Sequence, residues 1–138
     1  MTLPRLALHR WGAWVTLGWC AIASTAWAHA RLVRSEPRDQ AVLEESPDVV
    51  HLWFNELLDR GFHQVAIFPS TERTAKRRSN LTRGEPQVDP DDRTHLSVRV
   101  QPLPPGEYVI EYRVLSRDGH TAPGRILFRV RPPSGASH

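Results

Sequence analysis

Tyr108-Val109-Ile110-Glu111-Tyr112-Arg113-Val114 is the stretch that decides the fold. Large apolar side chains fill every second position from Tyr108 to Val114, and the positions between them carry a valine and two charged residues. Successive side chains of a strand point to opposite faces, so this pattern predicts a half-buried β-strand. A proline-rich turn sequence ends at Gly106, and Asp118-Gly119 follows the stretch, so turns bound the strand on both sides.

The same period of two residues recurs along much of the chain. It is clearest in four segments, of which the last two alternate apolar with polar residues and the first two carry apolar residues on both faces. These segments are 49–54, 63–68, 94–100 and 125–131, and two shorter extended pieces lie at 32–33 and 41–43. Turn residues separate the segments, and no long helical period interrupts them. Short strands at this spacing predict an all-β fold, namely a Greek-key β-sandwich or barrel.

The segment from residue 70 to residue 93 has a different composition. It is rich in Thr, Arg, Asn, Gly, Pro and Asp, which predicts a surface loop with one weak edge strand near residues 80–82. Lys76-Arg77-Arg78 lies inside this loop. Three cations without interleaved aromatic residues make a poor nucleic-acid surface, so we expect a solvated run of charge.

The beginning of the chain has the pattern of an export signal. Ala26-Trp27-Ala28 matches the Ala-x-Ala pattern of a signal-peptidase site, and a charge-free apolar run lies upstream of it. This run is shorter than the ~20 apolar residues that a membrane-spanning helix needs. We therefore predict a signal peptide at residues 1–28 and one exported domain at residues 29–138, in which His29 is the first residue.

The composition of the predicted mature chain narrows its chemistry. The only cysteine is Cys20 and the only methionine is Met1, so removal of the leader leaves neither residue type. Such a domain must be held together by its apolar core, since a disulfide is impossible. The whole chain has 18 basic and 15 acidic residues, and the leader takes Arg5 and Arg10 with it. A mature chain this close to neutral gives no indication of nucleic-acid binding.

Two places in the sequence carry metal-binding chemistry. His29 offers an α-amine and an imidazole to one ion after cleavage, and Asp118-Gly119-His120 supplies a carboxylate and a second imidazole. Tetragonal sites of nitrogen and oxygen ligands suit Cu(II), whereas Cu(I) prefers the sulfur ligands that this chain lacks. Gly119 lacks a Cβ and can take a positive φ, which lets Asp118 and His120 aim at one point.

Simpler interpretations of the same residues stay open. Asp-Gly is a common turn dipeptide, so Asp118-Gly119 alone indicates a hairpin corner more often than a ligand pair. His120 alone is equally typical of a surface residue. Their combination with a predicted N-terminal His29 is what favours a metal site. The other histidines of the mature chain are expected to be bystanders: His51, His63, His95 and His138.

Three motifs resemble the CopC family of periplasmic copper-binding proteins. The start His29-Ala30-Arg31-Leu32-Val33-Arg34-Ser35-Glu36-Pro37 is similar to the family's His-Ala-x-Leu-x-x-Ser-x-Pro. Residues 50–57, Val-His-Leu-Trp-Phe-Asn-Glu-Leu, resemble its Val-x-Leu-x-Phe-x-Glu segment. Residues 106–120, with Gly124 and Phe128 after them, resemble its Gly-x-Tyr…Arg-Val-x-Ser-x-Asp-Gly-His block. The resemblance covers nearly the whole mature chain.

The resemblance implies a cupredoxin-like or immunoglobulin-like β-sandwich. It also implies a Cu(II) site made by the amine and ring of His29 with Asp118 and His120. Some members place a glutamate at or near the copper, and Glu56 is the matching position. Several members carry a second, methionine-rich site for Cu(I), which this chain lacks. Two further departures affect loop shape: Gln40 stands where the family often has Gly, and Thr121 where many members have Pro.

The sequence leaves three functional hypotheses. The favoured one is a monomeric periplasmic protein, not an enzyme, that holds one Cu(II). It would serve copper homeostasis or resistance by sequestering the ion, or deliver the ion to an inner-membrane transporter of the CopD type. The second is a copper monooxygenase that cleaves polysaccharides with an amine-plus-two-histidine site. Asp118 argues against it, because an in-plane anion occupies the position that oxygen needs. The third is a metal-free adhesion or assembly sandwich.

Overall fold

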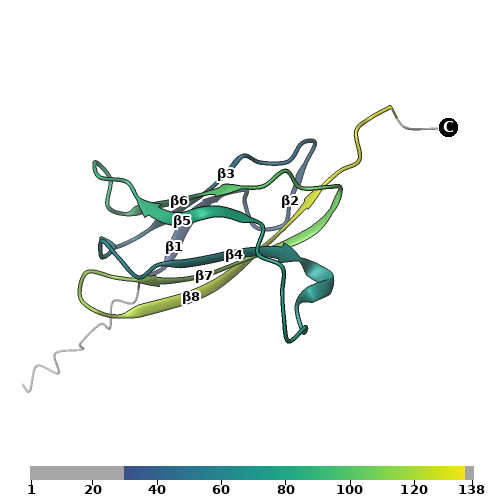
Figure 1. Cartoon of the computed structure of the whole chain (residues 1–138). Coiled ribbons are helices and arrows are strands. Elements are labelled where there is room, and N and C mark those ends of the chain that lie inside the picture. The colour runs from purple at the N-terminus through teal and green to yellow at the C-terminus, as the bar shows by residue number, and fades with distance from the viewer. Residues whose placement is uncertain (1–29, 136–138) are drawn as a thin grey trace, which may run out of the picture.

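A computed structural model describes residues 30–135 of the chain, and the regular secondary structure of this part is almost entirely β-strand (Figure 1). One short 3-10 helix, η1, lies among eight strands, and the described residues form no α-helix. The elements are β1 (Leu32–Glu36), β2 (Ala41–Leu43), β3 (Val49–Phe54), β4 (Gln64–Pro69), η1 (Ser70–Glu72), β5 (Thr82–Val88), β6 (His95–Val100), β7 (Gly106–Leu115) and β8 (Thr121–Val130). The prediction of an all-β fold is confirmed. No helix within residues 30–135 has the length and apolar character to cross a membrane.

The strands form two four-stranded sheets that lie one over the other (Figure 1). The first sheet has the order β1-β3-β6-β5 and the second the order β2-β8-β7-β4. Neighbouring strands are antiparallel except β2, which runs parallel to β8. The β7–β8 pair is the longest ladder and runs from Gly106 opposite Val130 to Leu115 opposite Thr121. The turn that joins these two strands carries Asp118 and His120.

The core lies between the two sheets and follows the alternation seen in the sequence. In β7, Tyr108, Ile110, Tyr112 and Val114 face inward, and β3 contributes Val50, Leu52 and Phe54. Phe54 and Tyr112 meet edge to face across the core, with ring centroids 5.6 Å apart. Each fully buried side chain of this size contributes about 1.5–3 kcal/mol, so the core can hold the domain without disulfides.

The edge strand of the first sheet is later and longer than the sequence predicts. It was expected near residues 80–82, whereas β5 spans Thr82–Val88 and pairs with β6. Its register shifts between Arg83 and Gln87, where Gly84 has φ of 73°. A polar, irregular strand with a proline is typical of a sheet edge and shows no apolar alternation, which is why the sequence pattern places it poorly.

All three cations of the charge run are exposed, as expected, but Arg78 also makes contacts that the sequence does not predict. Both terminal nitrogens of its guanidinium donate to Glu111 at 3.1 Å, and its Cζ lies 4.4 Å from the ring centroid of Phe68. Phe68 and Val109 are buried opposite each other outside the main core cluster. Arg78 therefore covers an apolar spot on the second sheet.

A substitution at Gly124 would test the packing beside Tyr112. The two residues are opposite in the β7–β8 ladder, and a Cβ on Gly124 would lie 2.1 Å from Oη of Tyr112. Gly124→Ala must displace a ring that packs on Phe54, so we expect a loss of about 1–3 kcal/mol in the free energy of unfolding. Gly61→Ala is the control, because its nearest atom would be 4.0 Å away. Equal urea midpoints for the two variants would contradict this packing.

Candidate metal centre

The turn between β7 and β8 brings Asp118 and His120 together. The amide of Ser116 donates to the carbonyl oxygen of His120 at 2.8 Å, and the amide of Gly119 donates to that of Ser116 at 2.9 Å. Gly119 has φ of 91°, and a Cβ there would meet nothing within 4 Å. The need for glycine is therefore conformational rather than steric, as the sequence predicts.

The side chains of the turn form a connected polar group. Nδ1 of His120 lies 3.0 Å from Oδ2 of Asp118, and the hydroxyl of buried Ser116 donates to Oδ1 of Asp118. About half of each of the Asp118 and His120 side chains is exposed, 49% and 47% respectively. A carboxylate and an imidazole thus lie in contact at a solvent-exposed surface, and the hydrogen bond from buried Ser116 orients the carboxylate.

Hydrogen bonds keep Asp118 ionised. The Ser116 hydroxyl and then the His120 ring lower the pKa of Asp118 from 3.8 to about 2. A carboxyl group with this pKa is already deprotonated at neutral pH, so it can bind a cation without first releasing a proton.

The loop after β3 connects the beginning of the described chain to this turn. On one side, the amide of Arg31 donates to Oδ1 of Asn55 at 2.5 Å, and the amide of Asn55 donates to the carbonyl oxygen of Arg31 at 3.0 Å. On the other side, the amide of Arg117 donates to the carbonyl oxygen of Leu57 at 2.9 Å. We call residues 55–59 the bridging loop, because Arg31 near the beginning of the described chain and Arg117 in the turn both hydrogen-bond to it.

His63 connects the bridging loop to the end of β7 through two hydrogen bonds. Its Nε2 donates to the carbonyl oxygen of Asp59 at 2.8 Å, and its Nδ1 accepts from the amide of Leu115 at 3.3 Å. The residue is 8% exposed. His63, which is expected to be a bystander to metal binding, therefore has a structural role beside the predicted site. No sequence signal could have identified this role, because Leu115 lies 52 residues away along the chain.

The predicted site residues have different outcomes in the structure. Asp118 and His120 are brought together, and Glu56 is half-buried in the bridging loop. His29 lies outside the described residues, as does His138. Among residues 30–135, no three His, Cys, Asp or Glu side chains are grouped closely enough to hold a metal ion, so Glu56 does not form such a group with Asp118 and His120.

The low pKa of Asp118 can be measured in the metal-free chain. An NMR titration of the carboxyl carbon should give a pKa near 2, and Ser116→Ala should move it toward 3.8, with Ser97→Ala as the control. Because the folded value lies below the unfolded one, ionised Asp118 adds stability above about pH 4, and this is lost as the pH falls toward 2. A native value of 3.8 would contradict the hydrogen-bonded geometry.

Comparison with known proteins agrees with the fold and identifies the family. The family model for the CopC domain matches residues 32–131. The chain is 27% identical over 128 residues to the copper transport protein CutJ of Bacillus subtilis strain 168, covering 92% of this chain but only 23% of that protein. It is 28% identical over 111 residues to protein YobA of Escherichia coli K12, covering 80% of this chain and 85% of YobA.

Solved structures show the same architecture. CopC from Methylosinus trichosporium OB3b has a TM-score of 0.65 and 27% identity, covering 79% of this chain and 100% of that one. PcoC, a methionine-rich copper resistance protein from Escherichia coli, has a TM-score of 0.61 and 25% identity, covering 75% of this chain and 100% of its own. Because the family model spans most of the chain, the protein belongs to the CopC family.

Proposed function

We propose that the mature protein begins at His29 and holds one Cu(II) ion in the periplasm. The proposed ligands are the α-amine and imidazole of His29 with the side chains of Asp118 and His120, and Glu56 is placed at or beside the ion. The relatives support a copper role, since one is named a copper transport protein and another a copper resistance protein. The ligand set and the oxidation state are our proposal.

The bridging loop is the observation that carries this proposal. It is hydrogen-bonded to Arg31 on one side and to Arg117 on the other. Two residues of chain span at most about 7 Å, so an amine at residue 29 stays within reach of the loop that also holds the turn. Buried Ala30 anchors the chain between them. Donors that are 89 positions apart in the sequence can therefore serve one ion.

The chemistry of the donors favours Cu(II). Two imidazoles, an amine and an ionised carboxylate make a nitrogen and oxygen set, which suits a tetragonal Cu(II) ion. The low pKa of Asp118 supplies a negative charge at neutral pH. The same charge favours holding copper over oxygen chemistry, so we propose binding and transfer rather than catalysis.

We further propose that the protein works as a monomer and delivers its ion to an inner-membrane transporter of the CopD type. The half-exposed Asp118 and His120 support this role, because a partner can approach them from solvent at the end of the β7–β8 hairpin. CutJ matches this chain over only 23% of its length, so that relative joins a similar domain to a much longer chain.

The N-terminal amine provides the sharpest test. A chain beginning at His29 should bind one Cu(II) in competition with a chelator, and a chain retaining Ala28 should bind at least tenfold more weakly because its His29 nitrogen is an amide. His120→Ala should also weaken binding, and His138→Ala should not. Equal affinities with and without Ala28 would overturn the proposed ligand set, and the mass of the periplasmic protein would check the cleavage position.

A further inference from the structure

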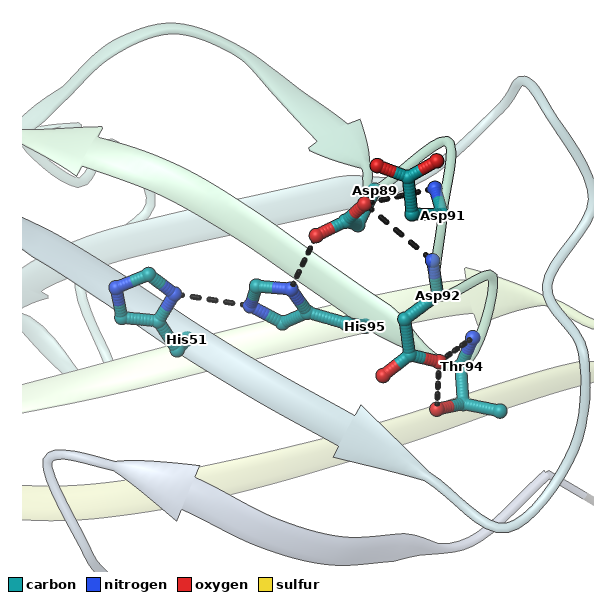
Figure 2. Close-up of polar contacts among 6 residues, drawn as sticks. All are labelled: His51, Asp89, Asp91, Asp92, Thr94 and His95. Carbon is teal, nitrogen blue, oxygen red and sulfur yellow. Dashed lines mark hydrogen bonds and ion pairs between the residues drawn. The ribbon is translucent and has the colours of Figure 1, made fainter.

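A second pair of histidines meets on the outer face of the first sheet. His51 of β3 and His95 of β6 come from neighbouring strands, and Nδ1 of His51 lies 2.9 Å from Nε2 of His95 (Figure 2). The core-facing residues of β3 are Val50, Leu52 and Phe54, so His51 lies on the opposite face. This pair shares no residue with the proposed His29 site.

Asp89 determines which nitrogen of His95 carries the proton. Its Oδ2 lies 3.4 Å from Nδ1 of His95, and its Oδ1 accepts from the amides of Asp91 and Asp92 at 2.9 and 3.3 Å (Figure 2). A carboxylate can only accept here, so Nδ1 of His95 is protonated and Nε2 presents a lone pair. A carboxylate behind a histidine in this way is the usual outer contact of a metal-binding imidazole.

The rings of the pair are held by packing. Trp53 stacks on His95 with centroids 4.6 Å apart and planes 9° apart, and on His51 at 5.6 Å. The guanidinium of Arg34 lies 4.5 Å from the Trp53 ring and pairs with Glu36, which is opposite His51 in the β1–β3 ladder. The His95 side chain is 14% exposed. Both imidazoles are therefore held next to each other before any ligand arrives.

The nitrogen separation fits a metal ion as well as a hydrogen bond. Ligand nitrogens about 2.0–2.1 Å from an ion are roughly 2.9 Å apart when they subtend a right angle. Right angles between adjacent ligands belong to the tetragonal geometry of Cu(II), whereas tetrahedral ligands are farther apart. Binding requires both rings to tilt and the His51 proton to move from Nδ1 to Nε2, so both imidazoles stay neutral.

We propose that His51 and His95 form a second, weaker Cu(II) site on the outer face of the first sheet. Water completes its coordination, because no three His, Cys, Asp or Glu side chains within residues 30–135 are grouped closely enough to hold one ion, and Asp89 contacts only the far nitrogen of His95. A site with two protein ligands releases its ion readily, which suits copper in transit rather than copper in storage. Asp89 is a positioning residue that acts through His95.

Trp53 gives this site its own signal. Of the five tryptophans, four lie at or before residue 27, so a chain beginning at His29 contains only Trp53. A second equivalent of Cu(II) should quench Trp53 fluorescence beyond the effect of the first. His51→Gln and His95→Gln should weaken this second step at least tenfold, and Asp89→Asn about tenfold. Ser97→Ala, opposite His51 in the β3–β6 ladder, is the matched control and should leave it unchanged.

A further variant and an NMR measurement distinguish a second copper site from a structural hydrogen bond. His120→Ala should weaken the first step and leave the second, so failure of the His29 site does not decide this proposal. In the unsubstituted chain, where folding is not at issue, the second equivalent should broaden the NMR signals of the His51 and His95 ring protons before those of His63. A second step that survives His51→Gln and His95→Gln, or no second step at all, means that the pair is only a structural hydrogen bond.

Discussion

The hydrogen bonds of the bridging loop are the constraint on which the rest of the site depends. Residues 55–59 leave β3 and are paired with Arg31 on one side and with Arg117 on the other. His63 hydrogen-bonds both to Asp59 of the same loop and to Leu115 at the end of β7. A sandwich can bring an early and a late segment to the same end of the molecule, and the hydrogen bonds of this loop connect Arg31 with Arg117. Arg31 lies two positions after His29 and Arg117 one position before Asp118, so the loop holds the neighbours of both proposed ligand groups.

The fold could be predicted from the sequence wherever one face of a strand is buried. The alternation from Tyr108 to Val114 is retained in β7, and Gly119 takes the positive φ expected of it. Prediction failed where the determinants are long-range or polar. The edge strand β5 has no alternation to detect, and Arg78 finds Glu111 and Phe68 only because folding places them beneath it.

The candidate site also has features that the sequence predicts and features that it does not. Spacing alone placed Asp118 and His120 on one turn, and the structure explains why both are oriented: Ser116 and the turn backbone hold the carboxylate. The sequence could not reveal the hydrogen bonds of His63 or the position of His51 beside His95, because those contacts join residues that lie 52 and 44 positions apart in the chain. The proposed His29 site would use the start of the mature chain and a turn in which Asp118 and His120 are half-exposed. The His51–His95 pair is instead built into a packed sheet face.

Paramagnetic broadening by a single equivalent of Cu(II) tests the central claim most directly. The account predicts that the amide signals of three separate stretches disappear together in a chain beginning at His29. These stretches are residues 30–31, 55–57 and 117–120, which meet only if the bridging loop joins the chain start to the turn. Broadening limited to residues 117–120, with Arg31 and Asn55 unchanged, would contradict the account.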